Sequence, residues 1–160
     1  MILHRIRSLL RPTAPLSAMA FDENGRPAST GDEGEVPGER LLGRRILIVE
    51  DEAMLAMDLE FTFGDEGAEI LGPALSLDAA QALIASEPEI DAAVLDVDIG
   101  GHDVFPVASL LQQRGVPIVF HTGHGSRTEL TALFPGAVTC IKPTLPAELV
   151  RQVRRLTDQD

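Results

Sequence analysis

The sequence predicts an α/β protein with a doubly wound, five-stranded parallel sheet and helices on both faces. From Gly43 onward, five short apolar runs alternate with five segments whose apolar residues recur at helical spacing. This is the pattern of βα units joined by right-handed crossovers. Four of the runs stop at a charged or hydroxyl-bearing residue. Ligands bind beyond the carboxyl ends of such strands, so these residues indicate a site.

Composition excludes several classes of protein. The chain has 160 residues, 44% of them hydrophobic, which is enough for one domain with an attached segment. Its net charge of −12 repels phosphate backbones and no basic patch offsets it, so we expect no nucleic-acid partner. No apolar run approaches the roughly 20 residues that cross a bilayer, which predicts no integral membrane segment. The single cysteine, Cys140, rules out a disulfide framework, and we expect a buried thiol in a cytoplasmic protein.

The first 43 residues differ in composition from the rest of the chain. Pro, Gly, Ser and acidic residues occur there without a hydrophobic period, which predicts that residues 1–43 form a disordered or partly helical extension. Its start, residues 2–11, is basic and amphipathic, and could form a short helix that docks on a membrane surface or a partner. We favour the simpler interpretation of a frayed tail, or of a chain that starts at Met19. Residues 44–160 form the predicted domain.

The first half of the domain contains two βα units. An apolar strand is expected at residues 46–49, followed by a helix from Glu52 to about Asp65. The apolar residues expected on one side of this helix are Met54, Leu55, Leu59 and Phe61. Residues 68–71 form a short second strand.

The next helix and strand lead to the position around which the chain is organised. Ser76 can cap a helix that runs to about Ser86, where Pro88 prevents its continuation. The apolar run at residues 92–95 reads as a buried strand, and it stops abruptly at Asp96. Asp96 is therefore the first charge at that strand end.

The second half repeats the alternation. Asp103 is expected to open the third helix, with Pro106 in its first turn and Gly115 after its last. Residues 117–121 form the fourth strand, and Ser126 has capping-box spacing ahead of the fourth helix.

The last βα unit completes the sheet. The fifth strand lies within residues 137–141, and the final helix starts at about Pro146. Apolar residues that stack on one face of that helix are Leu149, Val150, Val153 and Leu156.

Three carboxylates from two strand ends suggest a metal site. Glu50, Asp51 and Asp96 would raise one another's pKa unless a cation joined them, and Mg²⁺ suits an all-oxygen cluster best. The alternative is that Glu50, Asp51 and Glu52 form only the acidic first turn of a helix. That alternative does not explain Asp96 or Asp98, which follow a different strand.

The remaining strand ends offer a cation and a hydroxyl. Lys142 is the only lysine of the chain, and it lies between an apolar strand and Pro143. An exposed lysine at a strand end is the alternative, but a single Lys among arginines suggests a compact point charge aimed at a ligand. Thr122 and the amide of Gly123 suit a phosphoryl oxygen.

At these residues the sequence resembles a known family. Over about residues 44–158 it is similar, in order and spacing, to the receiver domain of bacterial two-component response regulators. The motifs that carry the resemblance are Val49-Glu50-Asp51-Glu52, Leu95-Asp96-Val97-Asp98, Phe120-His121-Thr122-Gly123 and Ile141-Lys142-Pro143. Each motif is weak alone, whereas the four in order are a strong signal. The resemblance implies the flavodoxin-like strand order 2-1-3-4-5.

The resemblance also implies a cofactor and a phosphoryl donor. Asp51 and Asp96 would hold Mg²⁺ directly, the backbone carbonyl of Asp98 would be a third ligand, and Glu50 would act largely through water. A sensor histidine kinase or a histidine phosphotransfer protein would supply the phosphoryl group.

The same resemblance assigns roles in phosphoryl transfer. Asp96 would be the phosphoacceptor, Lys142 would pair with the phosphoryl group, and Thr122 would hydrogen-bond to it. Asp98 and His124 would flank the entry path and tune the lifetime of the phosphorylated state. Positioning and electrostatics would carry this reaction.

Three features depart from the usual receiver. Thr139 occupies the position, three before the lysine, where the usual receiver has an aromatic switch residue. Residues 99–101 replace the usual Met-Pro and predict a more pliable loop. Residues 117–125 resemble the Phe-Ala-Thr-Gly-x-Tyr signature of a subclass of stand-alone alphaproteobacterial receivers tied to stress signalling, from which His121 and Gly125 depart.

These observations predict a single-domain receiver that is not an enzyme in the usual sense. We expect no output domain after the last helix, and therefore output by contact, through the fourth helix, fifth strand and fifth helix, with an unknown downstream protein. A phosphatase of the haloacid-dehalogenase type is one alternative, because it also uses a strand followed by Asp-x-Asp, here Asp96-Val97-Asp98. A degenerate receiver that acts only as an interaction module is the other.

Overall fold

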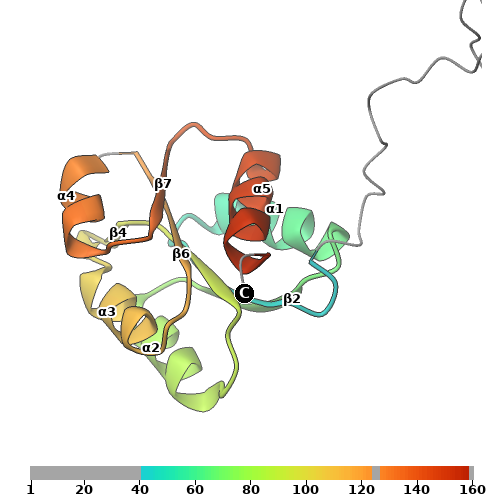
Figure 1. Cartoon of the computed structure of the whole chain (residues 1–160), viewed down its shortest axis with the longest axis horizontal. Coiled ribbons are helices and arrows are strands. Elements are labelled where there is room, and N and C mark those ends of the chain that lie inside the picture. The colour runs from blue at the N-terminus through green and yellow to red at the C-terminus, as the bar shows by residue number, and fades with distance from the viewer. Residues whose placement is uncertain (1–40, 124–126, 159–160) are drawn as a thin grey trace, which may run out of the picture. The chain divides into compact units, whose positions relative to one another are not determined.

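The computed structural model describes residues 41–123 and 127–158 (Figure 1). Their elements are β1 (Arg45–Val49), α1 (Ala53–Asp65), β2 (Glu69–Ala74), α2 (Leu77–Ser86), β3 (Ala92–Leu95), β4 (Asp98–Ile99), β5 (His102–Asp103), α3 (Phe105–Gln113), β6 (Ile118–Thr122), α4 (Arg127–Leu133), β7 (Val138–Ile141) and α5 (Pro146–Thr157). Five strands form a parallel sheet in the order β2-β1-β3-β6-β7, and β4 pairs with β5 in a separate hairpin. Without the hairpin, this is the predicted order 2-1-3-4-5, so the fold class is confirmed.

The register of the sheet brings its strand ends to one edge. Val49 lies opposite Leu95, Leu95 opposite Phe120, and Thr122 opposite Ile141. Because the strands are parallel, the residues that follow each of them meet at the same edge. The register thus places the strand-end polar residues side by side.

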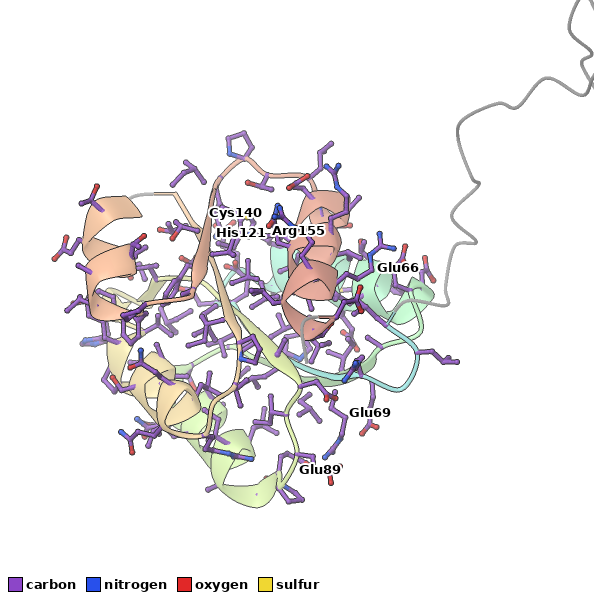
Figure 2. All side chains as sticks on the ribbon, in the orientation of Figure 1. Glu66, Glu69, Glu89, His121, Cys140 and Arg155 are labelled. Carbon is purple, nitrogen blue, oxygen red and sulfur yellow. The ribbon has the colours of Figure 1, made fainter. Side chains whose placement is uncertain are left out.

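Helices cover both faces of the sheet, as predicted. One core cluster joins Val49 and Leu95 to side chains of α2, α3 and α4. The other joins Ile48 and Val94 to side chains of α1 and α5. Successive residues of a strand point to opposite faces, which explains this division. Figure 2 shows the side chains that fill both layers.

The buried face of α1 differs from the predicted one. Met54 and Phe61 are 85% and 67% exposed, whereas Ala56, Leu59 and Phe63 are buried. The three buried residues have the spacing i, i+3, i+7 and share one side of the helix. Met54 and Phe61 each precede one of them by two residues, which is slightly more than half a helical turn, so they lie on the opposite side. The prediction was right for Leu55 and Leu59, which pack in the core, and wrong for Met54 and Phe61, because apolar residues occur on both sides of this helix.

The segment between β3 and α3 also differs from the prediction. Asp103 does not open α3; it lies in β5, opposite Asp98 of β4, and α3 begins at Phe105. The loop expected to be pliable is the two-residue turn of this hairpin. Gly100 and Gly101 have φ values of +62° and +82°, as a type I′ turn requires.

The remaining local predictions have mixed outcomes. The hydroxyl of Ser76 accepts a hydrogen bond from the Ala79 N–H at 3.2 Å and caps α2 as predicted. Cys140 is buried, as expected. Ser126 and residues 1–40 lie outside the described residues. Among the helices that the structure describes, none is long and apolar enough to cross a membrane.

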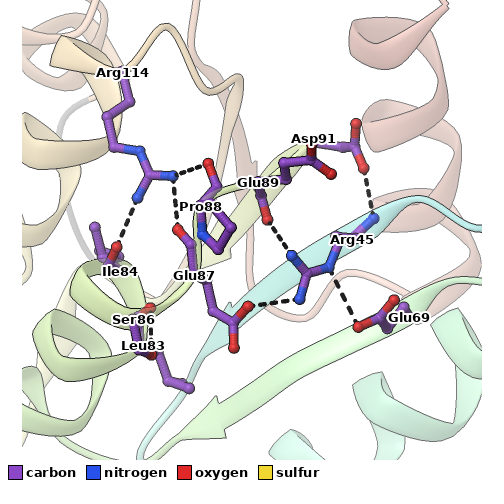
Figure 3. Close-up of polar contacts among 10 residues, drawn as sticks. All are labelled: Arg45, Glu69, Leu83, Ile84, Ser86, Glu87, Pro88, Glu89, Asp91 and Arg114. Carbon is purple, nitrogen blue, oxygen red and sulfur yellow. Dashed lines mark hydrogen bonds and ion pairs between the residues drawn. The ribbon is translucent and has the colours of Figure 1, made fainter.

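Two arginines hold the end of α2 in place: Arg114, at the C-terminal end of α3, and Arg45, on β1 of the sheet (Figure 3). The Arg114 guanidinium donates hydrogen bonds to the carbonyl oxygens of Ile84, Glu87 and Pro88 at 2.7 to 2.8 Å. The Arg45 guanidinium contacts the Glu87 carboxylate at 2.6 Å. Carbonyl groups at the C-terminal end of a helix lack hydrogen-bond donors within the helix, and the Arg114 guanidinium provides those donors here.

Candidate functional site

Three separate strand ends place a lysine between two acidic side chains. Glu50 follows β1, Asp96 follows β3 and Lys142 follows β7. Lys142 Nζ lies 2.6 Å from Asp96 Oδ2 and 3.0 Å from Glu50 Oε2. These contacts join positions 46 and 92 residues apart in the sequence, and parallel topology alone brings them together.

Burial makes these charges interact strongly. Glu50 is 1% exposed and Asp96 is 8% exposed. Burial raises the pKa of Glu50, although the hydrogen bond from Lys142 acts in the opposite direction. Burial alone would lower the pKa of Lys142, but hydrogen bonds to Asp96 and Glu50 outweigh it and the pKa is raised. The lysine is therefore a permanent cation at neutral pH.

Asp51 completes a cluster of carboxylates beside the lysine. One oxygen from each of Glu50, Asp51 and Asp96 lies within 4.8 Å of the other two. Asp51 is exposed, so the cluster is open to solvent on its side. A set of carboxylate oxygens with an open side fits a hard cation such as Mg²⁺, which binds through one or two carboxylates and keeps several waters.

Backbone N–H groups of the following loop hold two of these carboxylates. Asp96 Oδ1 accepts a hydrogen bond from the Asp98 N–H at 3.2 Å, and Asp51 Oδ2 accepts one from the Gly100 N–H at 2.9 Å. Asp98 is exposed, and its side chain accepts a hydrogen bond from the Gly101 N–H at 2.8 Å. The β4–β5 hairpin is thus connected to both ends of the cluster.

The other predicted site residues lie on β6, β7 and the loop after β6. Thr122 is buried at the end of β6, and its carbonyl oxygen accepts a hydrogen bond from the Lys142 N–H at 2.8 Å. Thr139 is buried on β7, opposite Phe120 of β6. His124 lies outside the described residues.

Sequence reasoning gave His121 no role, although the structure shows it as an unusual group. It is 2% exposed, and neither ring nitrogen has a hydrogen-bond partner in the part of the chain that the structure describes. Burial, followed by the charge of Lys142, lowers its pKa to about 4. The register places it opposite Cys140 of β7, and both side chains are labelled in Figure 2. A histidine within the apolar run at residues 117–121 was the available signal.

Fold and site together define the class of flavodoxin-like α/β domains that carry an acidic cluster at the carboxyl edge of the sheet. Residues 46–154 match the family model described as the response regulator receiver domain. The match covers well over half of the chain, which therefore belongs to the receiver domain family of two-component response regulators. Members of this family are signalling phosphoacceptor domains. The match favours the receiver over a phosphatase of the haloacid-dehalogenase type.

Individual relatives agree with this family. The chain is 27% identical over 119 residues to an uncharacterized transcriptional regulatory protein, YbdJ, of Bacillus subtilis strain 168. That alignment covers 72% of this chain and 52% of YbdJ, so the chain spans about half the length of this relative.

Solved structures are similar over the same region. The crystal structure of a response regulator receiver protein from Sinorhizobium medicae WSM419 has a TM-score of 0.66 and 28% identity, and the match covers 72% of this chain and 95% of that one. A CheY-like receiver domain protein from Methanospirillum hungatei JF-1 has a TM-score of 0.65 and 23% identity, with 73% and 95% covered. At that identity, the second match supports the fold alone.

Proposed function

We propose that this protein accepts a phosphoryl group on Asp96 from a sensor histidine kinase or a histidine phosphotransfer protein, in a Mg²⁺-dependent reaction. The observation that carries the proposal is the 2.6 Å contact between Lys142 Nζ and Asp96 Oδ2 within a cluster of three carboxylates. A lysine with this position can move its contact from the Asp96 carboxylate to a phosphoryl group bound there.

Asp96 acts as the nucleophile in this proposal. A carboxylate oxygen of Asp96 forms a bond to phosphorus while the bond from phosphorus to the donor imidazole breaks, and the imidazole leaves with the electron pair. Lys142 neutralises charge that collects on the phosphoryl oxygens. The Thr122 hydroxyl then donates a hydrogen bond to one of those oxygens.

The acidic side chains supply the metal site. Asp51, Asp96 and the backbone carbonyl of Asp98 would hold Mg²⁺, and Glu50 would contribute through water. When bound, Mg²⁺ neutralises negative charge on the phosphoryl group. Asp98 and His124, each two positions after a site residue, tune how long the phosphoryl group survives.

Output then takes place by contact with a downstream protein. The α4–β7–α5 side of the domain exposes apolar side chains: Leu133 is 50%, Ile141 42% and Leu145 77% exposed. Thr139, on β7, stands at the position where the usual receiver has an aromatic switch residue. The signal therefore reaches this surface without an aromatic ring that changes position. The exposed apolar residues support protein contact as the output.

The test is phosphorylation by a small phosphodonor in the presence of Mg²⁺. We expect one phosphoryl group per chain by intact mass, with a linkage that is stable in acid and labile in base. The label should be lost in Asp96→Asn and retained in the matched control Asp98→Asn. An unlabelled wild-type protein would indicate a degenerate receiver, and steady turnover of phosphate esters would indicate a phosphatase.

A further inference from the structure

We propose that the β4–β5 hairpin positions Asp51 for cation binding through the backbone N–H of Gly100. The inference rests on the proposed Mg²⁺ site. Its basis is the 2.9 Å hydrogen bond from the Gly100 N–H to Asp51 Oδ2, which joins residues 49 positions apart. Gly100 is therefore a positioning residue.

The hairpin is anchored well enough to hold a side chain in place. Ile99, at the end of β4, is 3% exposed and belongs to the core cluster that includes α2 and α3. The Gly101 N–H donates to Asp98 Oδ1 at 2.8 Å, and the Val104 N–H donates to the Val97 carbonyl oxygen at 2.8 Å. These two bonds close the hairpin, and Ile99 and Val104, one on each side of it, are both buried in that core cluster, which fixes the turn to the body of the domain.

Conformation rather than space requires glycine in this turn. A Cβ atom at Gly100 would have no atom within 4 Å, but φ is +62°, a region that L side chains rarely adopt. The positive φ values of Gly100 and Gly101 form the tight turn that leads back into β5. The turn therefore sets the position of the Gly100 N–H, which donates a hydrogen bond to Asp51.

Asp51 depends on such a donor more than its neighbours do. Glu50 and Asp96 are buried and both contact Lys142, whereas Asp51 is exposed at the open side of the cluster. A fixed N–H restricts the orientation of its carboxylate and occupies one oxygen, which leaves the remaining lone pairs for the cation. Loss of a partner that orients a metal ligand typically weakens metal binding by about 10- to 100-fold.

The test measures the Mg²⁺ dissociation constant of the full chain by isothermal titration calorimetry. Gly100→Pro removes the N–H that donates a hydrogen bond to Asp51. Gly115→Pro is a matched control, because Gly115 has φ of +70° and donates its N–H to the Gln112 carbonyl oxygen at 3.0 Å, in the turn after α3. We expect a dissociation constant raised about 10- to 100-fold in Gly100→Pro and unchanged in Gly115→Pro.

A second variant addresses the strain that proline introduces at a positive φ. In vitro translation with a hydroxyacid-charged suppressor tRNA places glycolic acid at position 100, so that an ester oxygen replaces the N–H and φ stays free. The same loss of affinity is expected. A folded Gly100 variant that binds Mg²⁺ as tightly as the wild type would overturn the inference and leave the proposed function intact. A wild-type protein that binds no Mg²⁺ and takes no phosphoryl group would overturn both.

Discussion

Replacing His121 by leucine should change how the stability of the domain depends on pH. The imidazole is 2% exposed and neutral in the folded state, because its pKa is lowered from 6.5 to about 4. In the unfolded chain the same group takes up a proton below pH 6.5. The unfolded state therefore binds more protons between these two values, and wild-type stability falls as the pH decreases from 6.5 towards 4.

The size of the effect follows from the two pKa values. A lowering from 6.5 to about 4 corresponds to about 3 kcal/mol of unfolding free energy, most of it lost by pH 4 and the rest below that pH. His121→Leu has no such group, so its stability should fall by about 3 kcal/mol less over the same range. At pH 7.5 the variant also removes two ring nitrogens that lack partners in the described residues, and we expect it to gain about 1 kcal/mol.

The assay is urea unfolding followed by far-ultraviolet circular dichroism, because the chain contains no Trp or Tyr for fluorescence. Free energies of unfolding for wild type and His121→Leu are compared at pH 7.5, 6.5, 5.5 and 4.5. The raised pKa of Glu50 also affects stability in this range, but it is present in both proteins and cancels in the difference. Equal losses of stability in the two proteins would refute the assignment of a neutral, buried His121.

Three further predictions concern other parts of the molecule. Lys142→Met leaves Glu50 and Asp96 buried without their cation and should lower the unfolding free energy by about 3 kcal/mol at pH 7.5. The loss should be smaller at pH 5, where protonation relieves the repulsion between the two carboxylates. Equal losses at both pH values would contradict this. Arg114→Ala removes three hydrogen bonds to carbonyl oxygens and should cost about 2 kcal/mol in urea unfolding, whereas the exposed Arg155→Ala should change stability by less than about 0.5 kcal/mol. Mg²⁺ at about 100 times its dissociation constant should stabilise the wild type by about 2.7 kcal/mol; chelation should reverse the gain, and Asp51→Asn should abolish it.

Sequence patterns were sufficient to locate the five parallel strands and the residues at their ends, but not to order the strands. Buried parallel strands consist of continuous apolar runs, so the point where each run stops marks a strand end. That is how Asp96 and Lys142 were placed at one edge although they are 46 positions apart. The strand order needed the family resemblance, because alternation alone does not distinguish the possible orders of five parallel strands.

Features that depend on tertiary contacts could not be predicted from sequence patterns. The buried face of α1 was assigned correctly at Leu59 but wrongly at Phe61, because Phe61 and Phe63 are equally apolar in the sequence and only packing against the sheet selects Phe63. His121 was given no role because a buried imidazole without a hydrogen-bond partner looks the same in a sequence as a solvated one. Burial is a property of the fold, and it is burial that lowers the pKa of His121.

The proposed metal ligand Asp51 and the group that orients it lie in different parts of the chain. The ligand type is visible locally, because Asp51 follows an apolar strand and is a carboxylate. Its orientation depends on Gly100, whose N–H reaches it across 49 residues through a hairpin with strands of only two residues each. Strands that short leave no alternating pattern, so residues 99–101 looked like a pliable loop. A change in the length of this turn would leave every strand end in place and still release Asp51, so motif residues alone do not determine the affinity of this site for a cation.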